Sequence, residues 1–342
     1  MFETVLIPWI MPDAGREVLK KARINCRFLH GPNGELPTPQ ALVEAVREVG
    51  VLIPRATLTV PDEVIKANPH LRGVANWGVG YNNINIRLAT ELGIPVTNTP
   101  GILTETTADL AWTLLMSTAR KIPQAHHYVL SGEWKGPGGK SFMGADIGPG
   151  GSNRRKVLGI VGFGKIGQAI CRRSKGFRMK VLVYDPPLKD LIERTRGVEY
   201  RELSDLLKES DFITLHSPLT EATRHLIGEK ELNSMKPTAV FVNTSRGPVV
   251  DEEALVSALQ QGKIAGAGLD VYENEPVLAP GLKELDNVVL LPHIGSASED
   301  TRGQMAVLAA KNAMIMLKGK KPPNPVNPQV FDSPEYYRRT ER

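Results

Sequence analysis

The stretch "VLGIVGFGKIGQAI" at residues 157–170 decides the fold class of this chain. A short apolar run leads into glycines with the spacing G-x-G-x-x-G and then into a helical pattern: Gly162, Gly164 and Gly167. The first glycine of such a turn makes it tight, the second lets backbone approach a pyrophosphate, and the third permits close packing of helix on strand. The backbone N–H groups of Lys165 and Ile166 would then face the phosphates. An ordinary turn between strand and helix explains this context less well than a dinucleotide site.

The acid that follows the next strand-like segment predicts which dinucleotide binds. "KVLVYD" ends in Asp185, 18 residues after Gly167 (185 − 167), close to the ~20 residues typical of the ribose-binding acid. A carboxylate there accepts hydrogen bonds from the adenine ribose and repels a 2′-phosphate, so we expect NAD. NADP remains an alternative, because Lys189 and Arg194 lie near enough in sequence to soften this discrimination. Alternatively, Asp185 is only a turn residue before Pro186 and Pro187.

Strand-like and helix-like segments alternate on both sides of this stretch, over residues 4–93 and 157–293. Such alternation predicts α/β architecture with two doubly wound parallel sheets. A long, mostly helical segment with a break near Pro123 and a Gly-rich segment at 132–156, expected to be a loop, separate the two series. The last long helix, at 298–319, could cross back to the N-terminal half, which would make the second domain an insertion in the first.

Length and composition agree with two globular domains and exclude several classes of protein. The chain has 342 residues, of which 41% are hydrophobic and 23% charged, with a net charge of +5. The basic residues form short clusters without interleaved aromatics, so we expect no nucleic-acid partner. Cys26 and Cys171 lie far apart without metal-ligand spacing, so we expect no metal and a reducing cytoplasm. No signal peptide and no membrane-spanning run is apparent.

Polar side chains follow three successive strand-like segments of the second series. Arg246 follows "FVNTS", Glu273 and Glu275 follow "GLDVY", and His293 follows "NVVLLP". The carboxyl ends of parallel strands share one edge of a sheet, where ligands bind. After hydride delivery to a carbonyl carbon, His293 could protonate the oxygen, and a paired carboxylate would stabilise the protonated imidazole. Arg246 could hold the carboxylate of a 2-oxo acid. The chemistry leaves Glu273 and Glu275 as competing partners of the histidine.

These segments together resemble a known family. "VGFGKIGQA", "HSPLTEATRHLI", "NTSRGPVVDEEAL", "GLDVYENEP" and "LLPHIGSAS" are similar to the NAD(P)-dependent D-isomer-specific 2-hydroxyacid dehydrogenases, and most similar to their glyoxylate/hydroxypyruvate reductases. The resemblance runs from about residue 74 to 328. It implies a Rossmann domain, 101–296, inserted into a flavodoxin-like substrate domain made of 1–100 and 297–342. It also implies a homodimer formed through the dinucleotide-binding domain, with "HHYVLSGEW" near the partner.

The resemblance also implies roles for individual residues. The catalytic set is Arg246, Glu275 and His293, which chooses Glu275 over Glu273. Asp270 is implied to face the nicotinamide carboxamide. Other implied cofactor contacts are Arg246 and His293 of the catalytic set and a group of residues that follow neighbouring strands: His216, Ser217, Pro218, Thr223, Thr244, Ser245 and Gly295. Backbone N–H groups at Val79 and Gly80, together with Arg246 and His293, are implied to bind the substrate.

Two departures and two alternatives accompany this interpretation. The family commonly has Asp where "GYNNIN" has Asn82 and Asn85, although Asn can still cap the following helix. The Gly-rich stretch at 136–153 looks longer than usual and has no assigned role. The alternatives to a reductase of small 2-oxo acids are a dehydrogenase of another substrate, such as D-3-phosphoglycerate, and an NAD-sensing corepressor-like binding protein.

Overall fold

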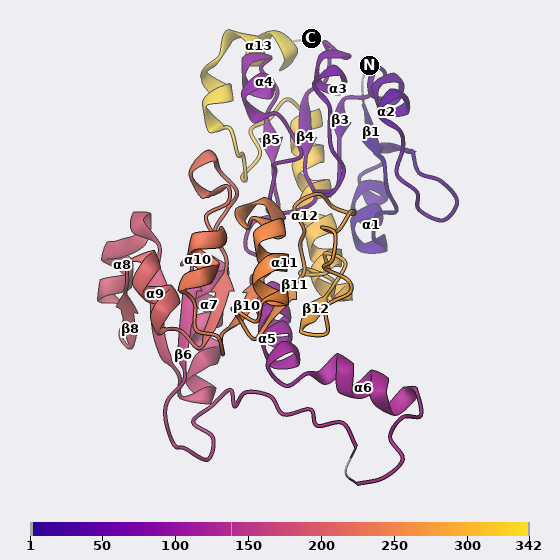
Figure 1. Ribbon diagram of the computed structural model, residues 1–342. Helices are drawn as coiled ribbons and strands as arrows, with labels where there is room; N and C mark the ends of the chain where they lie inside the picture. The colour runs from indigo at the N-terminus through magenta and orange to yellow at the C-terminus, as the bar shows by residue number, and fades with distance from the viewer. Residues whose placement is uncertain (1–2, 138, 341–342) are drawn as a thin grey trace. The chain divides into compact units, whose positions relative to one another are not determined.

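The chain forms two compact units, Met1–Leu103 with Ser296–Arg342, and Thr104–Gly295 (Figure 1). This architecture comes from a computed structural model that describes residues 3–137 and 139–340. Each unit is built on its own parallel sheet with helices on both faces, so the predicted fold class is confirmed.

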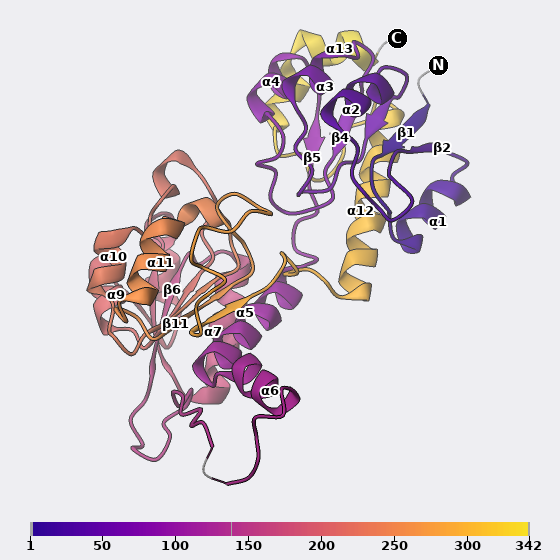
Figure 2. The ribbon, with the colours of Figure 1, turned by 45° about the vertical axis from the view of Figure 1, so that its right-hand side comes forward.

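The first unit carries a parallel sheet with the strand order β2-β1-β3-β4-β5, which is the flavodoxin-like order. Its strands are β1 (Thr4–Ile7), β2 (Asn25–Phe28), β3 (Val51–Leu52), β4 (Gly73–Ala75) and β5 (Val96–Thr97). Its helices are α1 (Asp13–Lys21), α2 (Pro39–Val46), α3 (Asp62–Lys66), α4 (Ile86–Glu91), α12 (Glu299–Leu317), the 3₁₀ turn η5 (Pro328–Asp332) and α13 (Pro334–Thr340). The long C-terminal helix α12 packs beside α1, far from it in sequence (Figure 2).

The second unit carries a parallel sheet in the order β12-β11-β10-β9-β6-β7-β8. After β6 the chain adds β7 and β8 on one side, and it then returns to add β9 to β12 on the other side, so the strand order reverses between β6 and β9. Its strands are β6 (Val157–Val161), β7 (Lys180–Tyr184), β8 (Val198–Tyr200), β9 (Phe212–Leu215), β10 (Val240–Asn243), β11 (Gly266–Leu269) and β12 (Val288–Leu290). Its helices are α5 (Thr104–Ala119), α6 (Ile122–Leu130), α7 (Lys165–Ser174), α8 (Lys189–Arg194), α9 (Leu203–Glu209), α10 (Glu229–Ser234) and α11 (Glu252–Gln260). Short 3₁₀ turns complete it: η1 (Lys175–Phe177), η2 (Pro186–Leu188), η3 (Glu221–Thr223) and η4 (Gly247–Val249).

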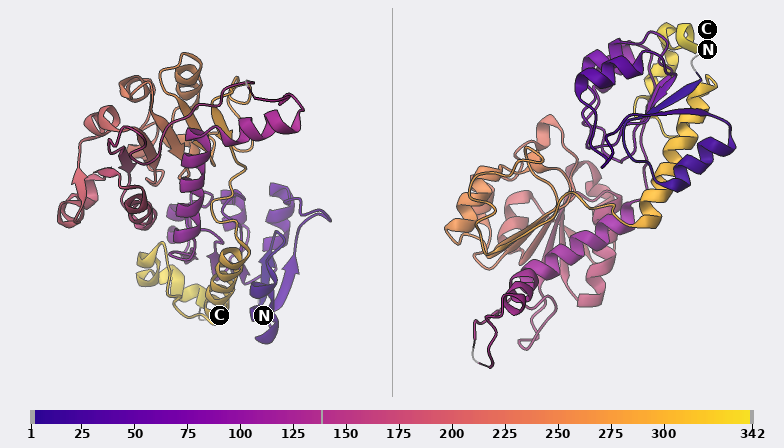
Figure 3. Two further views of the ribbon diagram at one scale, coloured as in Figure 1. Left: turned by 90° about the horizontal axis from the view of Figure 1, so that it is seen from below. Right: turned by 90° about the vertical axis from the view of Figure 1, so that its right-hand side faces the viewer.

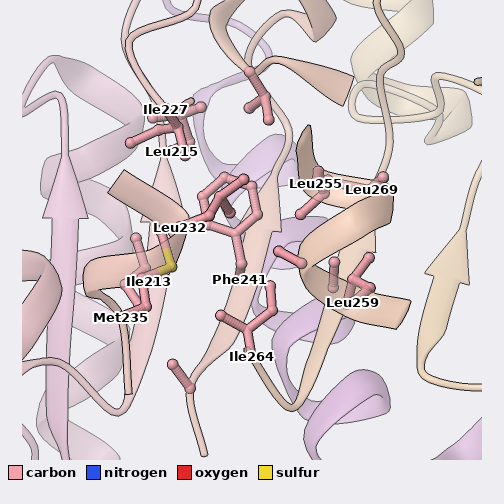
Figure 4. Close-up of a cluster of buried hydrophobic side chains, with 14 of the residues drawn as sticks. Ile213, Leu215, Ile227, Leu232, Met235, Phe241, Leu255, Leu259, Ile264 and Leu269 are labelled. Carbon is pink, nitrogen blue, oxygen red and sulfur yellow. The ribbon is translucent and has the colours of Figure 1, made fainter. Parts of the chain in front are cut away.

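The two faces of this second sheet are covered by different helices. One face packs against α9, α10 and α11, where Phe241 lies among Leu215, Leu232 and Leu255 (Figure 4). The other face packs against α5 and α7. Burying each of these large apolar side chains contributes about 1.5–3 kcal/mol, so the strands are held on both faces and their carboxyl ends are fixed. Helix α5 is buried along most of its length, and its apolar side chains pack within its own unit.

The connection between the two series follows the sequence prediction, with one refinement. The helix break falls at Arg120–Lys121, and Pro123 lies in the first turn of α6, where a missing N–H costs little. Between α6 and β6 the described residues contain no helix or strand (Figure 3). The proline-rich C-terminal tail contains η5 and α13, because proline suits the first turn of a helix and Phe331 packs against Tyr336.

Candidate active site

The three glycines of the turn after β6 have different surroundings. A Cβ on Gly162, whose φ is +95°, would lie 2.6 Å from the backbone nitrogen of Ser217 on the neighbouring strand end. A Cβ on Gly167 would lie 2.1 Å from the carbonyl oxygen of Gly162. A Cβ on Gly164, by contrast, would meet no atom within 4 Å. The first and third glycines therefore allow close packing, while the second borders open space beside the start of α7.

Replacement of Gly164 by valine tests whether that open space belongs to the cofactor. The folded chain has room for the side chain, so we expect little change in melting temperature. The side chain would keep a pyrophosphate from the N–H groups of Lys165 and Ile166, and loss of one such charge-assisted bond weakens binding roughly tenfold or more. Titration with NADH measures the affinity. Gly176→Val, which also enters open space, is the control; equal NADH binding by the Gly164 variant would contradict this role.

Asp185 lies directly after β7, close to the glycine turn. One of its carboxylate oxygens, Oδ2, accepts a hydrogen bond from the backbone N–H of Phe163 at 2.7 Å. This bond fixes the carboxylate against the turn. The second oxygen, Oδ1, has no hydrogen-bond partner among the described residues and is available to a ribose hydroxyl, as the sequence predicts for an NAD-binding acid.

Three buried polar atoms at neighbouring strand ends also lack partners within the described part of the chain: Nδ1 of His216, Oγ of Ser217 and Oγ1 of Thr244. Buried polar groups are normally hydrogen-bonded, and an unpaired one costs about 1–3 kcal/mol. They follow β9 and β10, next to the glycine turn. A dinucleotide along this edge would supply the missing partners, so these residues fit the cofactor.

His216 is buried as a neutral side chain, with Nε2 2.9 Å from Oγ1 of Thr214. Burial lowers its pKa from 6.5 to about 3. Between these two values the unfolded chain binds a proton that the folded chain does not, so the free energy of unfolding falls as the pH falls from about 6.5 to about 3.

We therefore expect the His216→Gln variant to lose less stability on acidification than the wild type. Well inside that window, the free energy of unfolding of the wild type should fall by up to about 1.4 kcal/mol more per pH unit than that of the variant. Urea unfolding at several pH values measures it. The matched control is His30→Gln, because His30 is exposed and lies in the other unit. Identical slopes of unfolding free energy against pH for wild type and His216→Gln would show that the burial of His216 does not govern the loss of stability in acid.

His293 and Glu275 form a hydrogen-bonded pair at the carboxyl edge of the sheet. Nδ1 of His293 lies 2.8 Å from Oε2 of Glu275, and both side chains are about one-third exposed, at 32% and 30%. The other oxygen of Glu275, Oε1, accepts the N–H of Tyr272 at 3.1 Å. Burial would raise the pKa of Glu275, but the hydrogen bond and charge of His293, the N–H of Tyr272 and the charge of Arg246 together bring this pKa below its usual value. The ionised carboxylate thus orients the imidazole and leaves Nε2 available.

The competing acid, Glu273, belongs to a different cluster. Its Oε1 lies 2.6 Å from Nε2 of His225 and 3.5 Å from Arg224, while Oε2 accepts the N–H of Glu252 at 3.4 Å. The buried Glu252 in turn accepts the N–H of Glu273 at 2.6 Å. The two glutamates of "ENEP" therefore have separate histidine partners, and the pair at the end of β12 contains Glu275.

Arg246 lies after β10 in a turn braced by an asparagine. Nδ2 of Asn243 donates to the carbonyl oxygen of Arg246 at 3.1 Å, and Oδ1 of Asn243 accepts both the N–H and the hydroxyl of Ser245 at 2.9 Å. Nη1 of Arg246 donates to the carbonyl oxygen of Ser245 at 2.5 Å. Burial lowers the pKa of Arg246, and the charge of Glu275 opposes this shift. An arginine stays charged in proteins, so a fixed cation stands beside the carboxylate of the pair.

Asp270 holds the chain immediately after the histidine. It is buried at the end of β11, where Oδ1 accepts the N–H of Ile294 at 2.7 Å, and a backbone N–H bond from Gly295 adds to this. Burial raises the pKa of Asp270, against the lowering effect of those N–H groups and of His293. A Cβ on Gly295 would lie 3.2 Å from Oδ2 of Asp270. Asp270 therefore fixes the turn that presents His293, whose own φ is +54°.

The remaining predicted residues have structural partners that the sequence does not reveal. Oγ1 of Thr223 donates to the carbonyl oxygen of Pro218 at 2.6 Å and accepts the N–H of Thr220 at 2.8 Å, which closes the loop after β9. In the first unit the carbonyl oxygens of Val79 and Gly80 accept hydrogen bonds from Asn98 and Asn76, at 2.8 and 2.7 Å. Their N–H groups have no acceptor within the described residues.

Asn82 and Asn85, where the resemblance leads us to expect aspartate, lie in the same unit. Oδ1 of Asn85 accepts the N–H of Leu88 at 3.0 Å and caps α4, so this prediction is confirmed. Two residues that matter for the site geometry were missed in the sequence. In the sequence, Asn243 is only a polar residue at the end of a strand-like segment, and Tyr272 is only an aromatic residue before "ENEP".

The second unit thus has the fold and the polar strand ends of a dinucleotide-binding oxidoreductase. The chain belongs to the D-isomer specific 2-hydroxyacid dehydrogenase family, because the model of that family's NAD binding domain matches residues 112–295. It is an oxidoreductase with an NAD-binding domain, as predicted.

Similar proteins agree with this assignment. The chain is 52% identical over 301 residues to a glyoxylate reductase of Thermococcus litoralis, which covers 87% of this chain and 89% of that protein. It is 49% identical over 296 residues to one of Korarchaeum cryptofilum, with 86% and 87% covered. Among solved structures, the NADPH-dependent glyoxylate/hydroxypyruvate reductase of Sinorhizobium meliloti in complex with NADP and malonate has a TM-score of 0.84, 32% identity, and coverage of 95% of this chain and 97% of that one.

Two kinds of feature are absent from the described part of the chain. Over residues 3–137 and 139–340, no helix is long and apolar enough to cross a membrane. No group of three or more His, Cys, Asp or Glu side chains in those ranges could hold a metal ion.

Proposed function

We propose that the protein reduces a small 2-oxo acid, glyoxylate or hydroxypyruvate, to the D-2-hydroxy acid with NADH or NADPH. The hydrogen bond between His293 and Glu275, beside a fixed Arg246 and at the same sheet edge as the glycine turn, carries this proposal. The relatives named glyoxylate reductase support the choice of substrate. The nicotinamide supplies the hydride.

The side chains of this unit have distinct tasks in the proposed reaction. His293 holds a proton at Nε2 and gives it to the carbonyl oxygen as that oxygen gains charge. Glu275 stabilises the imidazolium and keeps Nε2 directed away from itself, because it binds Nδ1. Arg246 binds the substrate carboxylate and polarises the carbonyl group. Asp270 keeps the backbone after His293 in place.

The first unit offers backbone N–H groups that suit a carboxylate ligand. The N–H groups of Val79 and Gly80 are candidates because their carbonyl oxygens are held by asparagines and their N–H groups are free of protein acceptors in the described chain. Two adjacent backbone N–H groups suit a carboxylate.

A panel of 2-oxo acids with NADH and NADPH tests the proposal. We expect turnover of glyoxylate and hydroxypyruvate, measured as oxidation of the reduced cofactor, and identification of D-glycerate as the product from hydroxypyruvate. Absence of turnover of every member with both cofactors would reject it, and would leave the NAD-sensing binding protein as the better interpretation.

We also propose a homodimer formed through the dinucleotide-binding unit. Large apolar side chains of α6 and the following loop are exposed: Ile122, Val129, Leu130, Trp134 and Met143. Leu130 and Trp134 are 71% and 62% exposed, and the segment extends from the body of its unit (Figure 3). Exposed apolar patches of this kind mark interfaces.

Replacing Leu130 with lysine and Trp134 with alanine is expected to weaken this dimer at least about hundredfold, because buried aromatic and aliphatic anchors dominate interface energies. Sedimentation equilibrium measures the association. The control is Val277→Lys, an equally exposed apolar residue outside the segment, at 66%. A wild-type monomer, or an unchanged dimer in the double variant, would reject the interface.

The free thiols of Cys26 and Cys171 support a cytoplasmic location. Cell fractionation with an antibody against the chain tests this placement.

A further inference from the structure

The second unit contains a cavity of about 580 Å³ that the reaction does not use. It opens at the edge of the sheet where the strands begin. Arg155 precedes β6, Arg178 precedes β7, and Arg196 precedes β8. The residues of the proposed reaction follow strands and so lie at the opposite edge of the same sheet. The cavity is therefore separate from the dinucleotide and catalytic residues.

The lining of the cavity is strongly cationic. Arg155, Lys175, Arg178 and Arg196 all contribute to it, and no Asp or Glu does. Among the described residues none of these four cations has a carboxylate within 4.0 Å, although most other arginines of this unit have one. Unpaired cations gathered around one cavity produce a local positive potential that attracts anions.

Arg155 is held in place by the protein. Its Nε donates to the carbonyl oxygen of Arg178 at 3.0 Å, and its Nη2 donates to that of Met179 at 3.0 Å. These bonds attach the end of the Gly-rich loop to the start of β7. Pro149 and Asn153 of the same loop line the cavity, so the end of the stretch without an assigned role in the sequence contributes to one of its walls.

The floor of the cavity is apolar and chemically inert. Cys171, Met179 and Val181 are buried there. Burial raises the pKa of the Cys171 thiol, even though Lys175 and Arg172 lie near enough to lower it. The thiol thus stays neutral, and the cavity offers a binding surface rather than a nucleophile.

The position of Arg178 adds a second observation. Its φ is +54°, at the end of η1, where glycine is the usual residue. The backbone of Arg178 thus has a conformation that favours glycine, while its side chain places a cation at the cavity. A glycine at this position would remove the charge without disturbing the backbone, which makes a clean test possible.

We propose that this cavity binds a small polyanion, a molecule that carries two or more phosphate or carboxylate groups. The volume lies within the range of small-molecule sites. Arginine side chains bind both phosphate and carboxylate through paired N–H donors. The apolar floor would receive the uncharged body of such a ligand. The site is distinct from the proposed reaction, and its test does not depend on turnover.

Isothermal titration of the full-length protein, saturated with NADH to occupy the glycine turn, tests the proposal. The probes are tripolyphosphate and citrate, which separate a phosphate ligand from a polycarboxylate ligand. The cavity variant combines Arg178→Gly with Arg196→Gln. The control variant combines Lys208→Gln with Lys230→Gln, two exposed lysines outside the cavity, so that both proteins lose two charges.

We expect at least one probe to bind the wild type and the control variant alike, and the cavity variant at least roughly tenfold more weakly. The melting temperature of Arg178→Gly alone should equal or exceed that of the wild type, which shows that the fold is intact. Binding of neither probe to the wild type would overturn the proposal. So would equal binding by the cavity variant, or an equal loss in the control variant, which would indicate only non-specific attraction to net charge.

Discussion

Replacement of His293 by alanine is expected to lower kcat for 2-oxo acid reduction by roughly 10²–10⁴-fold, the usual contribution of a positioned general acid. The imidazole is the proton donor in the proposed reaction, and Glu275 holds it at 2.8 Å through Nδ1. The glycine turn and Asp185 do not depend on this side chain, so the dissociation constant for NADH should change little. Steady-state rates and NADH titration of the same protein separate the two effects.

The chain supplies a matched control for this variant. His225 also pairs with a glutamate, Glu273, at 2.6 Å, but lies outside the proposed catalytic set. His225→Ala removes an imidazole from an equivalent pair, and we expect its kcat to stay near the wild-type value. Similar losses in both variants, or full activity of His293→Ala, would reject the acid–base assignment.

Replacement of Arg246 by glutamine is expected to lower kcat/KM by roughly 10²–10³-fold, as when a charged donor to a polarised carbonyl is lost. The guanidinium is fixed by the carbonyl oxygen of Ser245 and by the turn that Asn243 braces. A lysine at this position keeps the charge but not the paired donors, so Arg246→Lys should recover only part of the activity. Stopped-flow and steady-state kinetics with glyoxylate give both parameters.

An exposed arginine of the same unit provides the comparison for Arg246. Arg224 lies 3.5 Å from Glu273, and its side chain is 59% exposed. Arg224→Gln should leave kcat/KM near that of the wild type. If Arg246→Gln retained wild-type kcat/KM, the substrate carboxylate would have to be bound elsewhere.

The parts of the site that the sequence predicts are those with a local cause. The glycine spacing predicts the turn after β6, because Gly162 and Gly167 answer contacts within a few residues or with the adjacent strand. Asp185 follows from its distance along the chain. The alternation of segments likewise predicts two parallel sheets, and central strands such as β1 and β6 are buried over nearly their whole length.

Other parts depend on contacts between distant segments and could not be predicted from residue chemistry alone. Glu273 and Glu275 both follow β11, and only the positions of His225 and His293 in the folded unit separate their partners. The same holds for Asn243, whose amide braces the turn that carries Arg246. The cationic cavity combines three loops at the opposite edge, and no single stretch of sequence indicates it.

Transfer of deuterium from NADH with deuterium in place of both C4 hydrogens tests the central claim most directly. With hydroxypyruvate as substrate, the account predicts that deuterium appears at C2 of D-glycerate in the wild type, and at a greatly reduced rate in His293→Ala. NADPH labelled in the same way covers the alternative cofactor. Absence of label in glycerate with both cofactors, under conditions in which NADH binds, would contradict the account.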